Sequence, residues 1–460
     1  MLFQTWEFVI FFTIVMAVYV PLLRTRWWQL WLWLTSYVFY GWWNPLFLVL
    51  IFYSTAVDYL IGRRIGMAPN TAGSRRWLTL AILNNLFMLG FFKYAGFFAQ
   101  NLRTLFEILH IPLTVPEPNI LLPVGISFFT FQSMSYLIDV YRGKLRAEPQ
   151  FIRFAAFVAM FPQLVAGPIE RGTNILKQVR HAPVIRSLDV SDGISLFIVG
   201  LFKKVVMADS LSLYVDKVYG DPGAYSWLAL LFATYGFAWQ IYFDFSGYTD
   251  MARGIAKTMG LRLMLNFNNP YTAVDLSDFW RRWHISLSSW FRDYVYIPLG
   301  GGRGVFYLVY WNVFLTMLIS GFWHGAAWTF IVWGALNGLG AAATRNVEKQ
   351  NWYLKLPQLL KQALVFNFIC VTWVFFRAQG MGDAMLVLKR ICTGAAGAAE
   401  VPLVFFLMVA VVWLYQLIFN SSRKIWLESL PLRAGAMTAA IMLILIFSSS
   451  ASKQFIYFQF

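Results

Sequence analysis

His324 is the residue whose type and position most clearly suggest chemistry. It lies in LISGFWHGAAWTFIVWGALNGLG, a run that contains no charged residue. An ionisable side chain at membrane depth is costly and is a functional hypothesis by default, and a neutral imidazole in a dry site is suited to take a proton from a hydroxyl. The other interpretation is a histidine that only hydrogen-bonds between helices. Small neighbours (Gly321, Gly325, Ala326 and Ala327) favour chemistry, because they predict open space for a substrate tunnel beside the ring.

The segment 250–304 is basic and aromatic, and its centre reads LSDFWRRWHISLSSWFRDY. Its periodicity predicts one amphipathic helix with Ser277 as N-cap and with His284 on the aromatic side. Two interpretations fit this segment. Either the helix lies in the lipid headgroups with its arginines on phosphates, or it forms a cytoplasmic mouth where Arg281 and Arg282 bind a polyanionic small molecule.

A glycine-rich turn, YIPLGGGRG, follows and contains Arg303. Backbone amides in such a turn can approach phosphates, so Arg303 is a third candidate phosphate partner. The segment lacks the strand–turn–helix context of a dinucleotide fingerprint or a P-loop. A flexible cytoplasmic turn is the alternative interpretation.

The last six residues, 455–460, read FIYFQF and contain a single hydroxyl, that of Tyr457. Burial of each aromatic ring gains roughly 1.5–3 kcal/mol, so we expect this segment to leave water. It either folds into the extracytoplasmic mouth of the tunnel and carries Tyr457 towards His324, or it forms a hydrophobic plug or a docking tag for a partner enzyme.

Composition determines which elements must position these residues. The chain of 460 residues is 59% hydrophobic and only 13% charged, against about 25% charged in soluble domains. This predicts a single membrane-embedded domain over residues 1–460. The net charge of +16 is explained by Lys and Arg retained on cytoplasmic loops, without nucleic acid as a partner. Cys370 and Cys392 form neither a disulfide framework nor a metal-ligand pattern.

We expect an all-α polytopic membrane protein with about eleven transmembrane helices plus re-entrant and interfacial helices. Arginines in the loop 63–76, and basic residues before the runs at 362 and 434, place these loops in the cytoplasm. Both termini then lie on the extracytoplasmic side. Apolar runs of suitable length lie near residues 6–23, 27–61, 77–99, 120–141, 151–166, 193–208, 225–243, 305–343, 362–376, 401–419 and 434–449.

Several motifs together resemble the membrane-bound O-acyltransferases, specifically the bacterial branch around the alginate O-acetylation membrane protein. They are FWRRWHISLSSWFRDYVYIPLGG, FDFSGYTDMA, FPQLVAGPIER and SGFWHG. The resemblance implies a helical bundle around a tunnel, with His324 matching the family's invariant histidine and His284 its second polar position. It also implies a bacterial inner membrane enzyme that moves acetyl from acetyl-CoA towards an extracytoplasmic polysaccharide such as alginate, with a separate extracytoplasmic O-acetyltransferase as partner.

The resemblance further implies that Tyr457 is an acyl relay, because the aromatic C-terminal motif looks like the relay of bacterial polymer-acylation systems. Other members of the superfamily acylate peptidoglycan, transfer D-alanine or act on lipids, and these remain alternatives. A non-enzymatic transporter or channel, with His324 as a proton relay, is the rival from another class.

Overall fold

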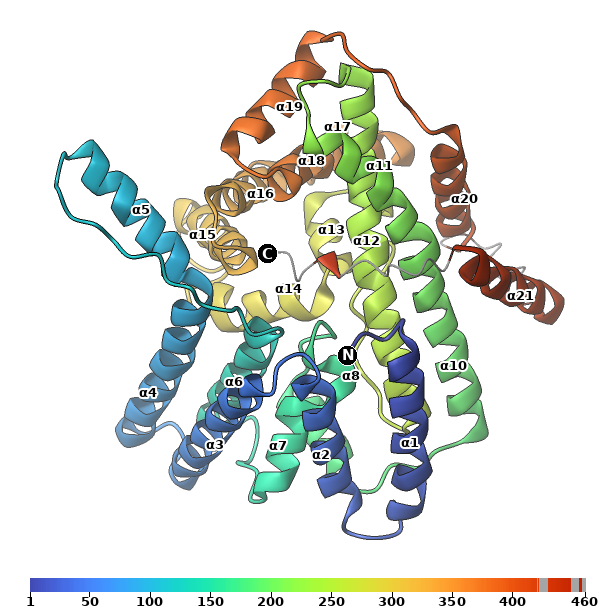
Figure 1. Cartoon of the computed structure of the whole chain (residues 1–460). Helices are drawn as coiled ribbons and strands as arrows, with labels where there is room; N and C mark the ends of the chain where they lie inside the picture. The colour runs from blue at the N-terminus through green and yellow to red at the C-terminus, as the bar shows by residue number, and fades with distance from the viewer. Residues whose placement is uncertain (420, 422–428, 448–454, 457–460) are drawn as a thin grey trace. The chain divides into compact units, whose positions relative to one another are not determined.

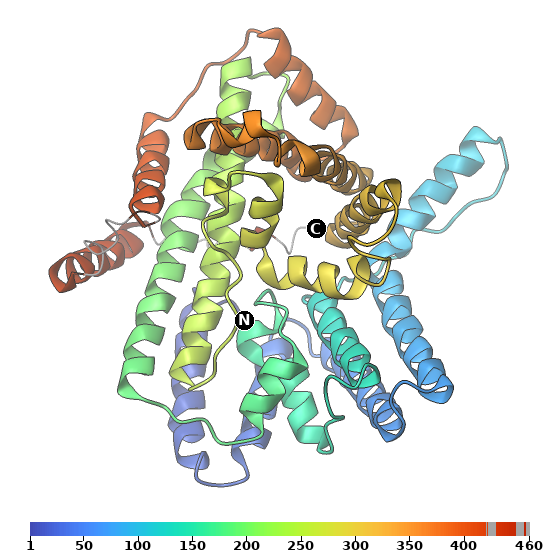
Figure 2. The same cartoon turned by 180° about the vertical axis from the view of Figure 1, so that it is seen from behind.

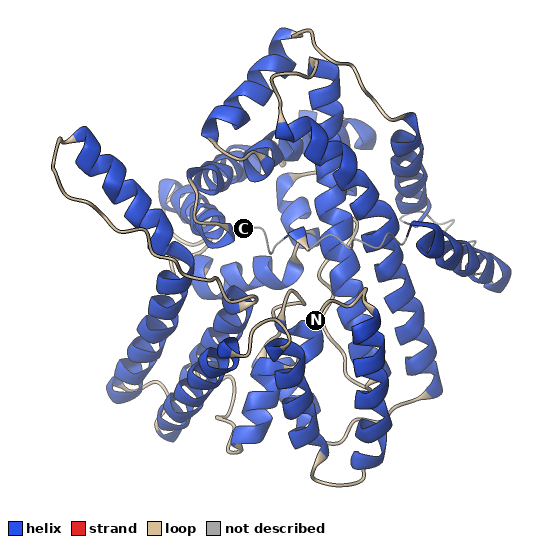
Figure 3. Cartoon of the chain, in the orientation of Figure 1, coloured by secondary structure: helices blue, strands red, loops and turns tan. Residues whose placement is uncertain are grey.

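The structure, a computed structural model, describes residues 1–419, 421, 429–447, 455 and 456. Helices and loops make up this part of the chain, which has no sheet (Figure 3). The predicted all-α class is therefore confirmed for the described residues.

By the criteria of length and composition, fewer helices can cross a membrane than the sequence suggested. Three stretches of the described chain, Leu46–Met67, Ala72–Ile108 and Gln358–Arg377, are long and apolar enough to span a bilayer. The expected count of about eleven is not confirmed by this measure, because many apolar helices are shorter than a full span.

The chain packs as two compact units. The first comprises Met1–Ile194 with Ala252–Met264, and the second Ser195–Met251 with Leu265–Phe460. Two helices contribute residues to both units, α10 (Ser187–Phe202) and α12 (Trp227–Thr258). The first unit also contains α1 (Trp6–Leu22), α2 (Trp28–Gly41), α3 (Leu46–Met67), α4 (Ala72–Leu89), α5 (Ala95–Ile108), α6 (Ile126–Tyr141), α7 (Phe151–Ala159), α8 (Phe161–Leu164) and α9 (Gly172–Val179) (Figure 1).

The second unit continues with a π-helical turn and ten further α-helices along its described residues. They are η2 (Lys203–Ala208), α11 (Asp209–Gly220), α13 (Leu276–Arg282), α14 (Ile285–Phe291), α15 (Phe306–His324), α16 (Trp328–Val347), α17 (Asn351–Leu354), α18 (Gln358–Arg377), α19 (Met381–Thr393), α20 (Leu403–Phe419) and α21 (Leu430–Phe447). π-helical turns also follow α4, at Gly90–Tyr94, and α14, at Arg292–Tyr296.

Helix α6 is the core of the first unit. Almost all its residues are buried, and it packs against α3 and α4. It begins after Gly125, whose φ of 78° and close approach to the Leu164 carbonyl exclude a side chain. Helix α4 begins with a capping box in which Thr71 and Ser74 satisfy each other's backbone amides.

In the second unit, α10 and α12 cross at two glycines. A Cβ atom on Gly200 would lie 2.5 Å from the carbonyl oxygen of Gly247. The close crossing brings the next residues of α10 and η2 against α12. Lys203 Nζ lies 2.7 Å from Asp250 Oδ2, and Lys204 Nζ lies 2.8 Å from Asp244 Oδ1.

Helices α15 and α16 run side by side as a hairpin (Figures 1 and 2). Gly338 of α16 packs against Phe314 of α15, as the glycine spacing in this run predicts for close helix packing. Aromatic side chains fill the space beside the hairpin, with the rings of Trp333 and Trp373 stacked at 5.8 Å.

The prediction of a single amphipathic helix around His284 is wrong. Two short helices, α13 and α14, replace it, and the break falls at His284, whose φ is 43° and ψ 55°. The N-cap of α13 is Asp275, whose side chain accepts from the Asp278 amide, and not Ser277. Local periodicity predicted continuity, but tertiary hydrogen bonds hold the left-handed residue.

Candidate active site

His284 is held by the side chain of Asn266. Its Nδ1 lies 3.1 Å from Asn266 Oδ1, which also accepts from the amide nitrogen of Ser286 at 3.2 Å and its hydroxyl at 2.9 Å. His284 is 1% exposed and Ser286 is fully buried. These three bonds to one oxygen fix the left-handed turn between α13 and α14.

The same network assigns the tautomer of His284. A backbone N–H can only donate, so the Asn266 atom facing Ser286 is the amide oxygen, and His284 Nδ1 must donate to it. The lone pair of the imidazole is then on Nε2. Burial lowers the pKa of His284 to about 3, so the ring is neutral at physiological pH.

His324, the last residue of α15, is 5% exposed and surrounded by aromatic rings. Its ring centroid lies 5.0 Å from those of Trp323 and Trp333 and 5.4 Å from that of Phe376. The indole of Trp323 also lies 6.4 Å from His284. The two histidines therefore flank one tryptophan, and the structure brings the two predicted catalytic histidines into one site.

The small residues beside His324 do not provide the open space that the sequence suggested. A Cβ on Gly325 would lie 2.1 Å from the Phe330 ring, and one on Gly321 would lie 2.4 Å from the Phe330 carbonyl oxygen and 2.8 Å from Gly334. These two glycines permit close packing of α15 on α16. The prediction that they clear a tunnel is wrong.

Two residues of the C-terminal motif reach the interior of the second unit. Phe455 is 1% and Ile456 is 4% exposed. The ring of Phe455 packs against Tyr248 at 5.0 Å and Phe245 at 5.6 Å, and the ring of Phe245 lies 4.6 Å from His284. Phe455 is thus separated from His284 by one aromatic ring, that of Phe245.

Asp244 anchors this segment by its backbone. The amide of Ile456 donates to Asp244 Oδ2 at 2.7 Å, while Lys204 Nζ lies 2.8 Å from Asp244 Oδ1 and 2.8 Å from Asp209 Oδ1. The side chains of Lys204 and Asp244 are each 4% exposed. Tyr457, the predicted relay, lies outside the described residues.

The three arginines predicted to bind phosphates differ in their surroundings. Arg282 Nε is paired with Asp278 Oδ1 at 2.7 Å, whereas Arg281 and Arg303 are exposed. The glycine turn has positive φ angles at Gly300, Gly301 and Gly304. Sequence reasoning missed Arg345, whose guanidinium lies against Gly302 and donates to the hydroxyl of Tyr296 at 3.3 Å.

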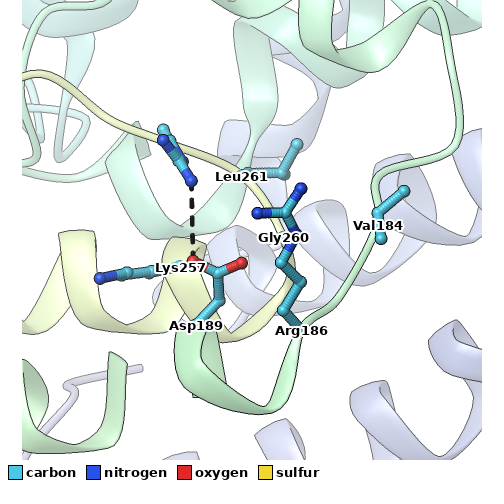
Figure 4. A pocket seen from close by; sticks show the side chains of 7 residues that line it. Val184, Arg186, Asp189, Lys257, Gly260 and Leu261 are labelled. Atoms are coloured by element: carbon cyan, nitrogen blue, oxygen red, sulfur yellow. Dashed lines mark ion pairs between the residues drawn. The ribbon is translucent and has the colours of Figure 1, made fainter. Parts of the chain in front are cut away.

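A separate basic pocket lies in the first unit (Figure 4). Its volume is about 100 Å³, well below the roughly 300–1,000 Å³ of ligand pockets. Lys257 pairs with Asp192 at 2.7 Å and Arg262 with Asp189 at 3.7 Å. Its size and the pairing of Lys257 and Arg262 with carboxylates argue against a coenzyme site. The lining residues are Val184, Arg186, Asp189, Lys257, Gly260, Leu261 and Arg262.

Asn266, Asp244 and Lys204 were not identified from the sequence as site residues. Asp244 lies in FDFSGYTDMA and Lys204 ends an apolar run, so the rule that singled out His324 also applies to them. Asn266 has no such signal, because polar loop residues are common. No cluster of three or more His, Cys, Asp or Glu side chains with metal-binding geometry occurs in the described part of the chain.

A buried site with two histidines, of which His284 is neutral, lies in an all-helical membrane protein and is suited to acyl transfer. The sequence model of the membrane-bound O-acyltransferase family matches residues 142–382. The chain belongs to this family, and it is an O-acetyltransferase by its similarity to the relatives below.

Three curated relatives illustrate the range of the family. The probable alginate O-acetylase AlgI of Azotobacter vinelandii is 45% identical over 355 residues, 76% of this chain and 69% of the relative. The peptidoglycan O-acetyltransferase of Helicobacter pylori is 37% identical over 78% of this chain and 73% of its own. The teichoic acid D-alanyltransferase of Bacillus subtilis is 29% identical over 57% of this chain and 71% of its own.

Asn266→Asp tests the state of His284. The carboxylate would replace a neutral acceptor 3.1 Å from Nδ1 and should raise the pKa of His284 from about 3 towards the ordinary value of about 6.5. Protonation removes the Nε2 lone pair, so activity of the variant should fall as pH drops below about 6. In the wild type His284 stays neutral over this pH range and contributes no such fall in activity.

The measurement is acyl transfer by purified protein between about pH 5 and 8, on either side of the ordinary histidine pKa. Asn312→Asp is the matched control, because Asn312 is also buried but donates to the Gly301 carbonyl. A profile for Asn266→Asp with the same shape as that of the control would contradict the assignment.

Proposed function

We propose that this enzyme takes acetyl from acetyl-CoA on the cytoplasmic side and delivers it for O-acetylation of an extracytoplasmic polysaccharide. Support comes from the relatives whose names specify alginate O-acetylation. Peptidoglycan is the second candidate acceptor, because one relative is a peptidoglycan O-acetyltransferase. D-alanyl transfer has weaker support, since the teichoic acid relative aligns over less of the chain.

The proposal includes the membrane setting. The enzyme resides in the bacterial inner membrane as one catalytic domain of 460 residues, with about eleven crossings around a tunnel and both termini outside. Basic loops support this orientation. An extracytoplasmic O-acetyltransferase then collects the acetyl group, and membrane lipids surround the domain.

The observation that carries the mechanism is the anchoring of Phe455 and Ile456 beside His284. Tyr457 is the next residue in the chain. In the proposed first step, the Tyr457 hydroxyl attacks the thioester carbonyl, His324 accepts the phenolic proton, and the carbon–sulfur bond breaks. The coenzyme leaves as a thiol after taking that proton, and a tyrosyl acetate ester remains for transfer to a hydroxyl of the partner or the polymer.

His284 has a supporting role in this step. Its Nε2 lone pair accepts a hydrogen bond and so orients the reacting groups. Arg281, Arg282 and Arg303 hold the coenzyme phosphates, since guanidinium groups bind phosphate oxygens in pairs.

His324→Ala should fold normally and lose about 10²–10⁴-fold in transfer rate, because the general base is removed. The assay is acetyl release from acetyl-CoA by purified protein. His181→Ala is the control, because His181 is exposed in a loop of the first unit. Near wild-type turnover by His324→Ala would refute the assignment.

Glutamine at Arg281 or Arg303 should raise KM for acetyl-CoA by about three- to tenfold, with kcat little changed, because these exposed charges contribute ground-state binding. Arg282→Gln should have a smaller effect, since Arg282 is already paired with Asp278. Arg76→Gln, also exposed but in the first unit, serves as control. An unchanged KM in the Arg281, Arg282 and Arg303 variants would instead indicate that these arginines contact lipid.

Tyr457→Phe deletes only the hydroxyl and should abolish polymer acetylation. Mass spectrometry of the wild type, without its partner and with acetyl-CoA, should find an added acetyl group on the C-terminal peptide, and the variant should lack it. Tyr307→Phe is the control, because Tyr307 is 69% exposed. Polymer acetylation by Tyr457→Phe would leave the plug or docking interpretation in place of the relay.

A further inference from the structure

One turn of α12 holds the described residues of the C-terminal motif by two different contacts. Asp244 and Tyr248 are one helical turn apart and therefore share a face of α12. The ring of Phe455 packs on Tyr248 at 5.0 Å and on Phe245 at 5.6 Å, and the amide of Ile456 donates to Asp244 Oδ2 at 2.7 Å. One residue is held by its side chain and the next by its backbone, and together they fix the register of the segment on the helix.

The acceptor for this amide is charged, although a neutral oxygen would satisfy it. A backbone N–H needs one acceptor, and a buried carboxylate is costly unless it is paired. Asp244 Oδ1 lies 2.8 Å from Lys204 Nζ, which also lies 2.8 Å from Asp209 Oδ1. The ion pair offsets the cost of burial and fixes the orientation of the carboxylate, so that Oδ2 faces Ile456.

A second ion pair shows that Asp244 is not needed merely to join η2 to α12. The neighbouring Lys203 of η2 lies 2.7 Å from Asp250 of the same helix α12, so this connection already exists. Asp244 differs from Asp250 in its bond to the amide of Ile456, 212 positions further along the chain. That bond is the feature of Asp244 that a purely structural ion pair does not explain.

The same turn of α12 also contacts the candidate active site. The ring of Phe245, which packs on Phe455, lies edge-on to that of His284 at 4.6 Å. Ile456 is joined directly to Tyr457, and consecutive Cα atoms are about 3.8 Å apart, so a residue that holds Ile456 also restrains its neighbour. Misplacement of a reacting group by about 1 Å can lower a rate about 10²-fold.

We propose that Asp244 is a positioning residue for acyl transfer. It holds the backbone of the C-terminal segment at Ile456 so that the next residue is presented to the reacting groups, and Lys204 keeps the carboxylate in the required orientation. The inference rests on the proposed function of Tyr457 as acyl relay. Because the bond is made to the main chain, it requires the N–H of residue 456.

Ile456→Pro tests the bond itself, because proline has no amide hydrogen to donate. Ile456→Val is the matched control, since it keeps both the donor and a β-branched apolar side chain. The proline variant should lower kcat for acetyl release from acetyl-CoA about 10²-fold, and the valine variant should stay close to the wild type. KM for acetyl-CoA should be unchanged in both, because the coenzyme is assigned to other residues.

Substitution of the acceptor separates amide binding from the ion pair. Asp244→Ala removes both and should lower kcat about 10²-fold. The double variant Asp244→Asn with Lys204→Met abolishes the ion pair but keeps a neutral oxygen for the amide, so it should remain within about tenfold of the wild type. Asp250→Asn, which alters the other ion pair, is the control. Equal losses in Asp244→Ala and in the double variant would overturn the proposal in favour of a structural ion pair.

Hydrogen exchange of the C-terminal peptide measures docking without an acyl donor. The Ile456 amide should exchange at least about tenfold faster in Asp244→Ala than in the wild type and in Asp250→Asn. Wild-type protection in Asp244→Ala would overturn the proposal, as would wild-type kcat in Ile456→Pro. The failure of the relay is distinguishable, because full activity of Tyr457→Phe would refute the relay and leave the exchange result unchanged.

Discussion

The buried ion pair between Lys204 and Asp244 is the interaction on which the second unit depends. Their charged atoms lie 2.8 Å apart with both side chains 4% exposed. Charges at that depth persist only when they are paired and hydrogen-bonded. Asp244 is therefore fixed in orientation, and its second oxygen is directed at the amide of Ile456. The close crossing of α10 and α12 at Gly200 brings this pair together, so the place of Ile456 follows from the crossing of two helices.

The sequence could predict what depends on local composition. The all-helical class follows from many long apolar runs, and the candidacy of His324 follows from one such run that contains a single ionisable ring. The conformation of His284 does not follow from local pattern. Its helical periodicity is regular, yet hydrogen bonds from a loop residue 18 positions earlier hold it at a φ of 43°. Such a conformation is strained for a residue other than glycine, and only the fold shows that Asn266 compensates for it.

Small residues beside a histidine have two opposite physical meanings. They can leave a cavity, or they can let another element approach, and one sequence does not distinguish the two. At Gly321 and Gly325 the approaching groups belong to Phe330 and Gly334 of the next helix. Buried charges are less ambiguous. Asp58, Lys204 and Asp244 lie in apolar segments, and each is buried in the structure, so the rule applied to His324 could have identified them as well.

The two histidines that flank Trp323 are suited to different parts of the reaction. His284 donates to the side-chain amide oxygen of Asn266, and burial lowers its pKa to about 3. A base that holds a proton so weakly is poorly matched to a phenol with an ordinary pKa of about 10. Its neutral Nε2 can nevertheless accept a hydrogen bond at every working pH. In the proposed reaction, proton abstraction is therefore assigned to His324 at the end of α15, and the amide of Asn266 distinguishes the proposed role of His284 from it.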